Sequence, residues 1–590
     1  MLKTIFKSVW TNTSEDQSIP KKMNFSATKL RNYFMNDGIL DFLNVYGEKF
    51  GFQKDDKSEN TYQEYIMTRG QEFEKYVMEF LKPKFKKMSF VNIGIKHEKF
   101  NKEGVFETIK HLKCGTDIIY QGFLDDKELG IHGIPDLLIR VDKLHELFGF
   151  YPECDINDTR REKNDFPHLY VVVDIKLSTV EFCKNGSISN NKLMMVYSAQ
   201  LFVYNKILEN LFFERTEIES PFFQPNVFLL SPRMKITDKI ILDGKETIAR
   251  IDLNNHVKKN FAIEVRKALN WLKELYENGE SWDILIPARN ELRPNMKNKE
   301  DYPWHDVKSV LAKQQKEISN CPGISYEASI EISEKRKTIE DHIGEIKNPK
   351  KRRLIEVLNE VQSDNSSDDS ELEKIRTHPI ISISQDKMNF YVDFEFISGS
   401  EFSFDPNYRT HLYLIGLGYE SNGKFKYERF ILDSITDANE RMIIQQWISR
   451  MRTISRNREF QLIHWSNAEP SFFNKLKESL QIRGVFNWQD LKKLFEDCPV
   501  LLKEHDGNVK NLKLKTVAKS MKRMGHIDSD WDDDMTNGMT ANMVIIRGIQ
   551  ANLPKFMDFP GIEKLIHYNQ IDCATLYEIV KYVQSKKRSF

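Results

Sequence analysis

The sequence predicts an α/β protein in which two α/β domains are joined by a helical and polar middle segment. Strand-like and helix-like hydrophobic patterns alternate up to about residue 290, and a second alternation starts at Met388 and continues to the end of the 590 residues. Between them lies a Ser- and Asp-rich run, residues 363–370, whose composition cannot bury a core. The expected organisation is a flexible tail at 1–22, a first domain at 23–290, a helical middle segment and linker at 291–376, and a second domain at 377–590.

Composition indicates a soluble intracellular chain. Hydrophobic residues make up 40% and charged residues 29%, and no apolar run approaches the ~20 residues that a membrane helix needs, so no membrane partner is expected. The six cysteines lie far apart without a Cys-x-x-Cys pair, which argues against a zinc ribbon and fits a reducing compartment. The net charge of zero leaves nucleic-acid binding open, because binding depends on local rather than global charge.

The stretch 170–177 has the pattern of a buried strand, since Val, Ile and Tyr dominate it. Asp174 and Lys176 interrupt this apolar run. Side chains two residues apart on a strand point to the same face, so the carboxylate and the ammonium group project together. Charges on a buried strand are costly unless they are paired or bound to a metal ion. The pattern therefore indicates a functional site.

A second carboxylate is expected next to this strand. Gly133-Ile-Pro135-Asp136 is typical of a turn that leads into another strand, where the missing N–H of proline is tolerated. Asp136 and Asp174 on neighbouring strands could hold a hard divalent cation, Mg²⁺ or Mn²⁺, through oxygen ligands. Lys176 beside them could hold or polarise a water molecule, and the ion would offset the charge that builds up on a phosphate.

Two helices flank these strands in the sequence. Residues 198–206 predict a helix on which Gln200 and Tyr204, four residues apart, share a face and can hydrogen-bond a phosphate or a base edge. Residues 69–81 predict an amphipathic helix that carries Glu72 and Glu74.

Four motifs follow one another along the chain: Gly70-x-x-x-Glu74, Gly133-x-Pro135-Asp136, Asp174-x-Lys176 and Gln200-x-x-x-Tyr204. In this order they resemble RecB-type nucleases of the PD-(D/E)XK superfamily over residues 24–290. The resemblance implies a restriction-endonuclease-like fold. It also implies that Glu74, Asp136, Asp174 and the backbone carbonyl of Ile175 are metal ligands, that Lys176 is the catalytic lysine, and that Gln200 and Tyr204 contact substrate or support the site. The Gly-x-x-x-Glu spacing from Gly70 selects Glu74 over Glu72. Some relatives carry an iron–sulfur cluster, but Cys114, Cys154 and Cys183 lack its spacing, so no cluster is expected.

The second domain opens with a predicted three-stranded meander. Residues 389–397, 411–419 and 424–432 have strand patterns, and Asn422-Gly423 between the last two is a hairpin-turn pair. Asp393 and Glu395 lie two residues apart on the first strand and therefore share a face. Further along, Ala468-Glu469 opens a predicted helix. In the last predicted helix, Tyr568 and Asp572 share a face at a spacing of four residues.

This second pattern resembles the DEDD exonuclease branch of the RNase H-like superfamily, in its Tyr-x-x-x-Asp subtype, over residues 388–590. The resemblance implies that Asp393, Glu395, Glu469 and Asp572 hold two divalent cations and that Tyr568 orients the attacking water. Glu469 departs from the family pattern, which has Asp at that position, and Asp490 is an alternative fourth carboxylate. Glutamate is one methylene longer than aspartate, which changes the reach of this ligand.

Both halves together resemble the group of nucleases that pair a RecB-like domain with a C-terminal RNase H-like domain. The function expected from this resemblance is metal-dependent hydrolysis of phosphodiester bonds in nucleic acid, with DNA favoured over RNA as the partner. The alternative is a nucleic-acid-binding or scaffold protein in which the C-terminal site, or both sites, are degenerate.

Overall fold

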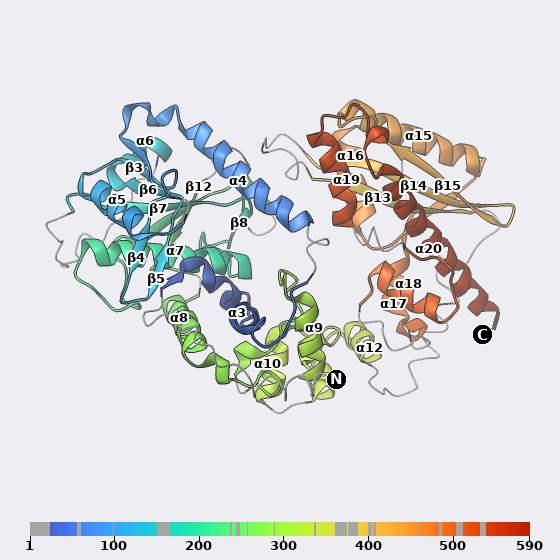
Figure 1. Cartoon of the computed structure of the whole chain (residues 1–590). Coiled ribbons are helices and arrows are strands. Elements are labelled where there is room, and N and C mark those ends of the chain that lie inside the picture. Colours follow the sequence, from blue (N-terminus) through green and yellow to red (C-terminus); the bar gives the residue numbers. More distant parts are fainter. Residues whose placement is uncertain are drawn as a thin grey trace. The chain divides into compact units, whose positions relative to one another are not determined.

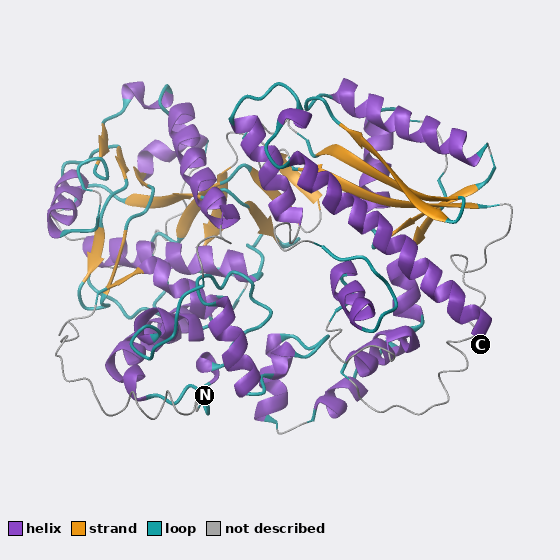
Figure 2. Cartoon of the chain, turned by 45° about the vertical axis from the view of Figure 1, so that its right-hand side comes forward, coloured by secondary structure: helices purple, strands orange, loops and turns teal. Residues whose placement is uncertain are grey.

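A computed structural model shows a mixed α/β protein whose described residues form four β-sheets (Figures 1 and 2). The chain divides into two compact units, which we call the N-terminal unit, residues 1–320 with 404–406, and the C-terminal unit, residues 321–403 with 407–590. The expected linker at 363–370 lies outside the described residues. The structure describes residues 24–55, 61–97, 99–149, 166–236, 239–243, 248–256, 258–287, 289–335, 338–359, 375, 387–398, 404, 409–456, 458–482, 486–502, 511–531 and 538–589.

A six-stranded mixed sheet forms the centre of the N-terminal unit. Its strand order is β12-β9-β7-β6-β3-β2, with β7 parallel to β9 and antiparallel to β6. The strands are β2 (Phe90–Asn92), β3 (Ile118–Tyr120), β6 (Leu137–Arg140), β7 (Tyr170–Ile175), β9 (Asn226–Leu230) and β12 (Ile248–Asp252). Because all six residues of β7 are buried, the strand predicted at 170–177 is confirmed as a core strand apart from its last two residues.

Helices cover both faces of this sheet. Val171, Val173 and Ile175 belong to one hydrophobic core with Phe73 and Val77 of α4 (Thr61–Leu81). Val172, the intervening residue, belongs to a second core with α7 (Lys192–Phe212). Since side chains alternate along a strand, Asp174 and Lys176 project with Val172 towards the α7 face. The helices expected at 69–81 and 198–206 are confirmed within α4 and α7, which are both longer.

The remaining elements of the N-terminal unit surround this central sheet. Two small sheets have the strand orders β1-β5-β4 and β11-β10-β8. The strands are β1 (Phe25–Ser26), β4 (Leu124–Asp126), β5 (Ile131–Gly133), β8 (Thr179–Phe182), β10 (Arg233–Ile236) and β11 (Lys239–Asp243). The helices are α2 (Arg31–Phe34), α3 (Ile39–Tyr46), α5 (Lys102–Lys113), α6 (Leu144–Phe148), α8 (Phe261–Asn278) and α9 (His305–Gln314).

Residues 291–320, which the sequence placed in the middle segment, belong to the N-terminal unit. Lys308 of α9 is fully buried, and its Nζ lies 2.9 Å from Asp37 Oδ2 and 2.5 Å from Asp301 Oδ2. Trp304, also buried, donates a hydrogen bond to Asn44 Oδ1 at 2.9 Å. These contacts tie the segment to the start of the unit, because a buried ammonium group requires charged partners.

A five-stranded sheet forms the core of the C-terminal unit (Figure 2). Its order is β15-β14-β13-β16-β17, in which β13, β14 and β15 are antiparallel and β13, β16 and β17 are parallel. The strands are β13 (Met388–Ile397), β14 (His411–Ser421), β15 (Lys424–Ile431), β16 (Phe460–His464) and β17 (Trp488–Asp490). The expected meander is therefore confirmed, and Asn422 and Gly423 in its turn both have positive φ angles, 52° and 75°.

Two long helices cover opposite faces of this sheet. The ring of Phe394 on β13 packs on Trp447 of α15 (Asp437–Ser455), at 5.6 Å between centroids. The ring of Tyr391, whose side chain points the other way, packs on Tyr577 of α20 (Ile562–Ser589), at 5.4 Å. Asp393 and Glu395 have the same parity as Tyr391 and therefore face α20, which Figure 1 shows in red beside the strands.

Besides α15 and α20, the described part of the C-terminal unit contains shorter helices. They are α10 (Tyr326–Glu334), α11 (Ile339–Gly344), α12 (Pro349–Leu358), α16 (Ala468–Ser479), α17 (Leu491–Asp497), α18 (Leu514–Arg523) and α19 (Gly538–Gln550). Throughout the described part of the chain, no helix combines the length and the apolar character that crossing a bilayer requires.

Candidate active sites

The first candidate site lies where β6 and β7 run side by side. Asp136 directly precedes β6, and its Oδ2 accepts a hydrogen bond from the backbone N–H of Ile175 at 2.6 Å. Asp174 is 1% exposed, and its Oδ2 lies 2.6 Å from Lys176 Nζ. The structure thus brings together the two aspartates and the lysine that the sequence singled out.

Burial sets the protonation of this group. Burial, followed by the negative charge of Asp174, raises the pKa of Asp136 well above its ordinary value. Burial alone would lower the pKa of Lys176, but the charges of Asp174 and Asp136 outweigh it and hold the pKa above its ordinary value. Lys176 therefore carries a positive charge that partly neutralises the two aspartates.

Glu74 reaches the same site from α4. Its Oε1 accepts hydrogen bonds from the Tyr120 hydroxyl at 2.7 Å and from Gln121 Nε2 at 2.9 Å. The charge of Glu74 contributes to the raised pKa of Asp136, whereas Glu72 pairs with Arg69 at 2.6 Å. In the part of the chain that is described, Glu74, Asp136 and Asp174 are not among the groups whose ligand atoms all lie within 4.8 Å of one another.

Gln200 and Tyr204 form the helical wall of this site. Gln200 Nε2 donates a hydrogen bond to the Tyr204 hydroxyl at 2.7 Å, and Tyr204 is only 2% exposed. A Cβ atom on Gly133 would lie 2.0 Å from Cε1 of Tyr204, so glycine at that position is needed for the ring to fit. Because Tyr204 is buried, its position favours support of the site over contact with a substrate.

The second candidate site is a compact group of acids between β13 and α20. Asp393, Glu395 and Asp572 each offer a carboxylate oxygen, and these oxygens all lie within 4.8 Å of one another. Asn569 of α20 donates a hydrogen bond to Asp393 Oδ2 at 2.6 Å. A Cβ atom on Gly416 of β14 would lie 2.0 Å from Asn569 Oδ1, so this glycine allows α20 to approach the sheet.

The acids of the second site have strongly raised pKa values. Burial is the largest cause for all three, and the negative charge of neighbouring carboxylates adds to it for Asp393 and Glu395. The pKa of Glu395 rises to about 8 and that of Asp572 to about 7, while that of Asp393 rises well above its ordinary value. Protons therefore neutralise much of this group at neutral pH, and a divalent cation could take their place.

Aromatic side chains hold Asp572 in position. The Tyr568 hydroxyl, one turn earlier on α20, hydrogen-bonds Asp572, and Trp531 Nε1 donates to Asp572 Oδ1 at 3.1 Å. Burial and the surrounding acids raise the pKa of Tyr568, so the phenol stays protonated. The Nζ atom of Lys515 lies 4.3 Å from the centre of the Tyr568 ring and 5.2 Å from that of Trp531.

Glu469 lies near this group but outside its compact core. Its charge contributes to the raised pKa values of Asp393, Glu395 and Asp572. Its Oε2 lies 3.5 Å from Nδ1 of His464, at the end of β16. Asp490 has a structural role, because its Oδ1 accepts hydrogen bonds from the backbone N–H of Ser466 at 2.9 Å and of Lys492 at 3.0 Å, where it caps α17.

Sequence reasoning missed Lys515, Trp531, Asn569 and His464. Asn569 directly follows Tyr568 on α20, so helical periodicity could have predicted that it faces the sheet. Lys515 and Trp531 come from segments with no motif of their own, and only the folded chain brings them to the acids.

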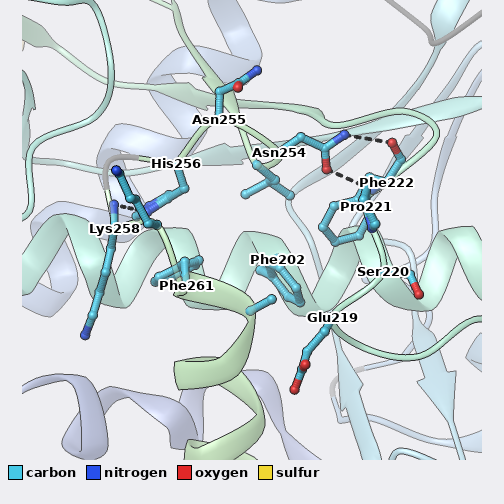
Figure 3. A pocket seen from close by; sticks show the side chains of 13 residues that line it. Phe202, Glu219, Ser220, Pro221, Phe222, Asn254, Asn255, His256, Lys258 and Phe261 are labelled. Carbon is cyan, nitrogen blue, oxygen red and sulfur yellow. Dashed lines mark hydrogen bonds between the residues drawn. The ribbon is translucent and has the colours of Figure 1, made fainter.

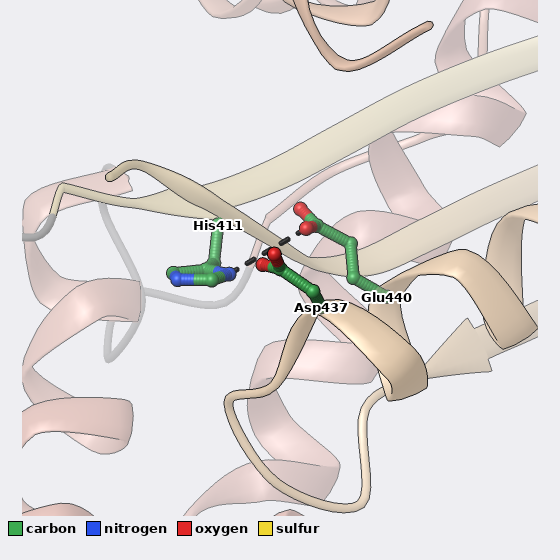
Figure 4. A group of neighbouring side chains, drawn as sticks. All are labelled: His411, Asp437 and Glu440. Carbon is green, nitrogen blue, oxygen red and sulfur yellow. Dashed lines mark ion pairs between the residues drawn. The ribbon is translucent and has the colours of Figure 1, made fainter. Parts of the chain in front are cut away.

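A third cluster, drawn in Figure 4, combines His411 at the start of β14 with Asp437 and Glu440 at the start of α15. Arg409 also contacts both acids, and its Nη2 lies 2.6 Å from Asp437 Oδ1. Burial alone would raise the pKa of Glu440, but hydrogen bonds from His411 and Arg409 lower it instead. The guanidinium group of Arg409 pairs with both acids, so ion pairs join β14 to α15 at this cluster.

A pocket of about 400 Å³ lies in the N-terminal unit, on the side of α7 that carries Phe202 (Figure 3). Phe202 is half a turn from both Gln200 and Tyr204 on α7, which separates the pocket from the acidic site. His256 stacks on Phe261 in the pocket wall, with 3.9 Å between ring centroids. Burial and the charge of Lys258 lower the pKa of His256 to about 4, so the ring is neutral.

No family model, curated protein or solved structure matches this chain. The geometry of its sites is therefore the basis for a functional assignment.

Proposed function

We propose that this chain is a divalent-metal-dependent nuclease that hydrolyses phosphodiester bonds, with DNA as its expected substrate. The observation that carries the proposal is the group formed by Asp393, Glu395 and Asp572, whose carboxylate oxygens lie within 4.8 Å of one another. Buried acids at this separation repel each other unless protons or cations neutralise them. An all-oxygen donor set of this kind suits Mg²⁺ or Mn²⁺.

We assign the C-terminal unit to the RNase H-like class with a DEDD exonuclease-type site. Support comes from the antiparallel meander continued by two parallel strands, and from acids on its first strand and its last helix. We assign the N-terminal unit to the PD-(D/E)XK class of RecB type. Asp136 beside β6, Asp174 with Lys176 on β7, and Glu74 on α4 support this assignment.

The donor set of the second site fits a metal ion, which would stabilise charge on the phosphate and lower the pKa of a bound water. Asp393, Glu395 and Asp572 would hold the ion. The protonated Tyr568 hydroxyl, anchored on Asp572, would orient the water for attack on phosphorus. Asn569 and Trp531 fix the carboxylates of Asp393 and Asp572 through their hydrogen bonds.

The first site offers a different combination of groups. Asp136, Asp174 and Glu74 supply the oxygen ligands, and Lys176 supplies a permanent positive charge 2.6 Å from Asp174. With a metal ion bound, this ammonium group would be released from Asp174 to hold the attacking water or the phosphate. Tyr204 and Gln200 keep the site closed on the α7 side.

The proposal is tested with end-labelled single- and double-stranded DNA and RNA in Mg²⁺, Mn²⁺ or EDTA. Asp174→Ala should abolish cleavage by the first site and Asp393→Ala cleavage by the second. Losing a metal ligand removes both the ion and the water that it activates, so each change should reduce the rate at its own site by at least ~100-fold.

Asp437→Ala is the matched control, since it removes an acid that Arg409 already pairs, and its activity should equal that of the parent chain. Circular dichroism and a thermal melt show that each variant is folded. Metal-dependent cleavage that survives undiminished in the Asp174→Ala, Asp393→Ala double variant would refute the assignment.

One observation favours a second candidate function for the C-terminal unit. Glu469 lies beside His464 at 3.5 Å and outside the compact acid group, whereas a two-metal site needs a fourth ligand. If the C-terminal unit binds DNA without cutting it, all cleavage depends on Asp174 in the N-terminal unit. Loss of all activity in Asp174→Ala, with none lost in Asp393→Ala, would establish that alternative.

A further inference from the structure

Helix α18, Leu514–Arg523, is a strongly basic helix beside the second site. Its ten residues, LKTVAKSMKR, contain four cations and no acid. Val517, Ala518 and Met521 are buried, which fixes the face that packs on the unit. Surface helices commonly mix both signs of charge, so a helix with cations alone needs a further explanation.

The cations follow one side of this helix. At 100° per residue, Lys519 and Lys522 lie within about 40° of Lys515 around the axis, and Arg523 within about 80°. Lys519 and Arg523 are exposed, and Lys515 is half-buried. From Lys515 to Arg523 the stripe rises about 12 Å along the axis, which is long enough to meet more than one phosphate of an extended strand.

Lys515 places one end of this stripe at the acids. Its Nζ lies 4.3 Å from the Tyr568 ring centre and 5.2 Å from the Trp531 ring centre, and both rings belong to side chains that hydrogen-bond Asp572. Lys519 lies one turn further along α18 and is exposed to solvent. The stripe therefore starts at the acid group and leads outwards from it.

We propose that the basic stripe of α18, formed by Lys515, Lys519, Lys522 and Arg523, binds the phosphate backbone of a single nucleic-acid strand and guides it to Asp393, Glu395 and Asp572. Lys515 binds the phosphate next to the acids, and Lys519 binds the next one along the strand. This inference rests on the proposed nuclease function of the C-terminal unit and adds the residues that hold its substrate.

The arrangement answers an electrostatic problem. A buried acid group repels a polyanion, and a chain with zero net charge does not attract one by its overall field. A row of ammonium groups that ends at the acids supplies local attraction where it is needed. Lys522 Nζ lies 2.8 Å from Asp530 Oδ2, and a phosphate that binds Lys522 would compete with this ion pair.

The first experiment measures binding without metal, so that cleavage does not interfere. Anisotropy of a fluorescein-labelled single-stranded oligonucleotide is recorded with the full chain in EDTA between 50 and 300 mM salt. Each phosphate contact contributes about 0.7 to the slope of log Kd against log salt for a single strand. Lys515→Gln and Lys519→Gln should each weaken binding several-fold and lower the slope by about 0.7. Lys515→Arg, which keeps the positive charge, should retain the affinity and the salt slope of the parent chain.

Lys424→Gln is the matched control, because Lys424 is exposed at the start of β15, the edge strand of the same sheet. Its Kd and slope should equal those of the parent chain. A purely structural role of Lys515 or Lys519 would lower the melting temperature without changing the salt slope.

The second experiment measures cleavage in an Asp174→Ala background, where only the second site can act. The same lysine variants should raise KM more than they lower kcat, and the effect should shrink at high salt. Unchanged binding slopes together with an unchanged KM would overturn the α18 proposal while leaving Asp393-dependent cleavage intact. Reduced slopes in a chain that never cleaves would instead support the stripe and refute the nuclease assignment.

Discussion

Replacing Asp393 by asparagine should stabilise the metal-free protein at high pH. Asp393 faces Glu395 and Asp572 in a buried group whose carboxylate oxygens lie within 4.8 Å of one another. Asparagine has nearly the same shape, and its carbonyl oxygen can still accept the hydrogen bond that Asn569 donates to Asp393 Oδ2 at 2.6 Å. The substitution therefore removes a negative charge without leaving a cavity and without removing the acceptor that Asn569 uses.

The size of the effect follows from the spacing of the charges. Two unit charges 4.8 Å apart interact by about 3 kcal/mol at an effective dielectric constant of about 20. Asp393 has two such neighbours, and the attraction of Lys515, which would also be lost, offsets part of this repulsion. The net gain should be about 3 kcal/mol when the group is ionised, which corresponds to roughly 6–12 °C in the melting temperature of a unit of this size.

The gain should depend on pH in a defined direction. Folding raises the pKa of Glu395 to about 8 and that of Asp572 to about 7. The protonated acids therefore favour the folded state below pH 4, and this contribution is lost as the pH rises through 7 to 8. At pH 5 Glu395 and Asp572 are largely protonated, so Asp393→Asn should have little effect, whereas at pH 8.5 both are mostly ionised and the effect should be larger.

Differential scanning calorimetry of the full chain in EDTA at pH 5 and pH 8.5 measures this difference. Glu428→Gln is the matched control, because the hydrogen bonds that Glu428 receives from Arg450 lower its pKa; this change should not stabilise at either pH. In the parent chain Mn²⁺ should raise the melting temperature at pH 8.5, and Asp393→Asn should lose most of that increase. A lower melting temperature of Asp393→Asn at pH 8.5, or an equal shift at both pH values, would refute the reasoning.

Two further predictions concern the N-terminal unit. Gly133→Ala should displace the ring of Tyr204, since the new Cβ would lie 2.0 Å from Cε1. Urea unfolding should then show a free energy of unfolding lower by about 1–3 kcal/mol, and Asp174-dependent cleavage should fall. Gly70→Ala, whose Cβ meets no atom within 4 Å, is the control and should not lower the stability. Lys308→Ala should destabilise the unit by about 3–5 kcal/mol, because it leaves buried Asp37 and Asp301 without their cation; the same substitution at exposed Lys313 on α9 should leave the urea midpoint unchanged.

Much of the strand pattern could be predicted from the sequence because it depends on local periodicity. The meander at 388–432 and the buried strand at 170–175 follow from β-branched and aromatic residues at regular spacing. The parity of Asp393 and Glu395 also follows from strand geometry. The partners of these acids on α18 and beside α20 do not, because they depend on how distant segments pack.

The extent of the N-terminal unit also depends on contacts between segments that are distant in the sequence. Residues 291–320 have a polar composition, and helical periodicity gives no reason to bury Lys308. Its burial depends on Asp37, far away in the sequence, and on Asp301, both of which lie within 3 Å of its ammonium group. Pairing of this kind is a property of the fold and is not encoded in a local pattern, so composition alone assigned the segment to the middle of the chain.

The two candidate sites neutralise their acids by different means. In the N-terminal unit the ammonium group of Lys176 lies 2.6 Å from Asp174. It compensates the charge of Asp174 at every pH at which Lys176 stays protonated. In the C-terminal unit the nearest cation, Lys515, lies over the rings of Tyr568 and Trp531, and the acids keep raised pKa values of about 7 and about 8. A cation that enters the second site must therefore displace protons, whereas one that enters the first must displace an ammonium group from Asp174. Metal binding at the second site should thus weaken more steeply as the pH falls from 8 to 6. Among the described residues, Lys176 is paired with an acid of the first site, whereas Lys515 lies over the rings beside the second, which is where the proposed stripe of α18 begins.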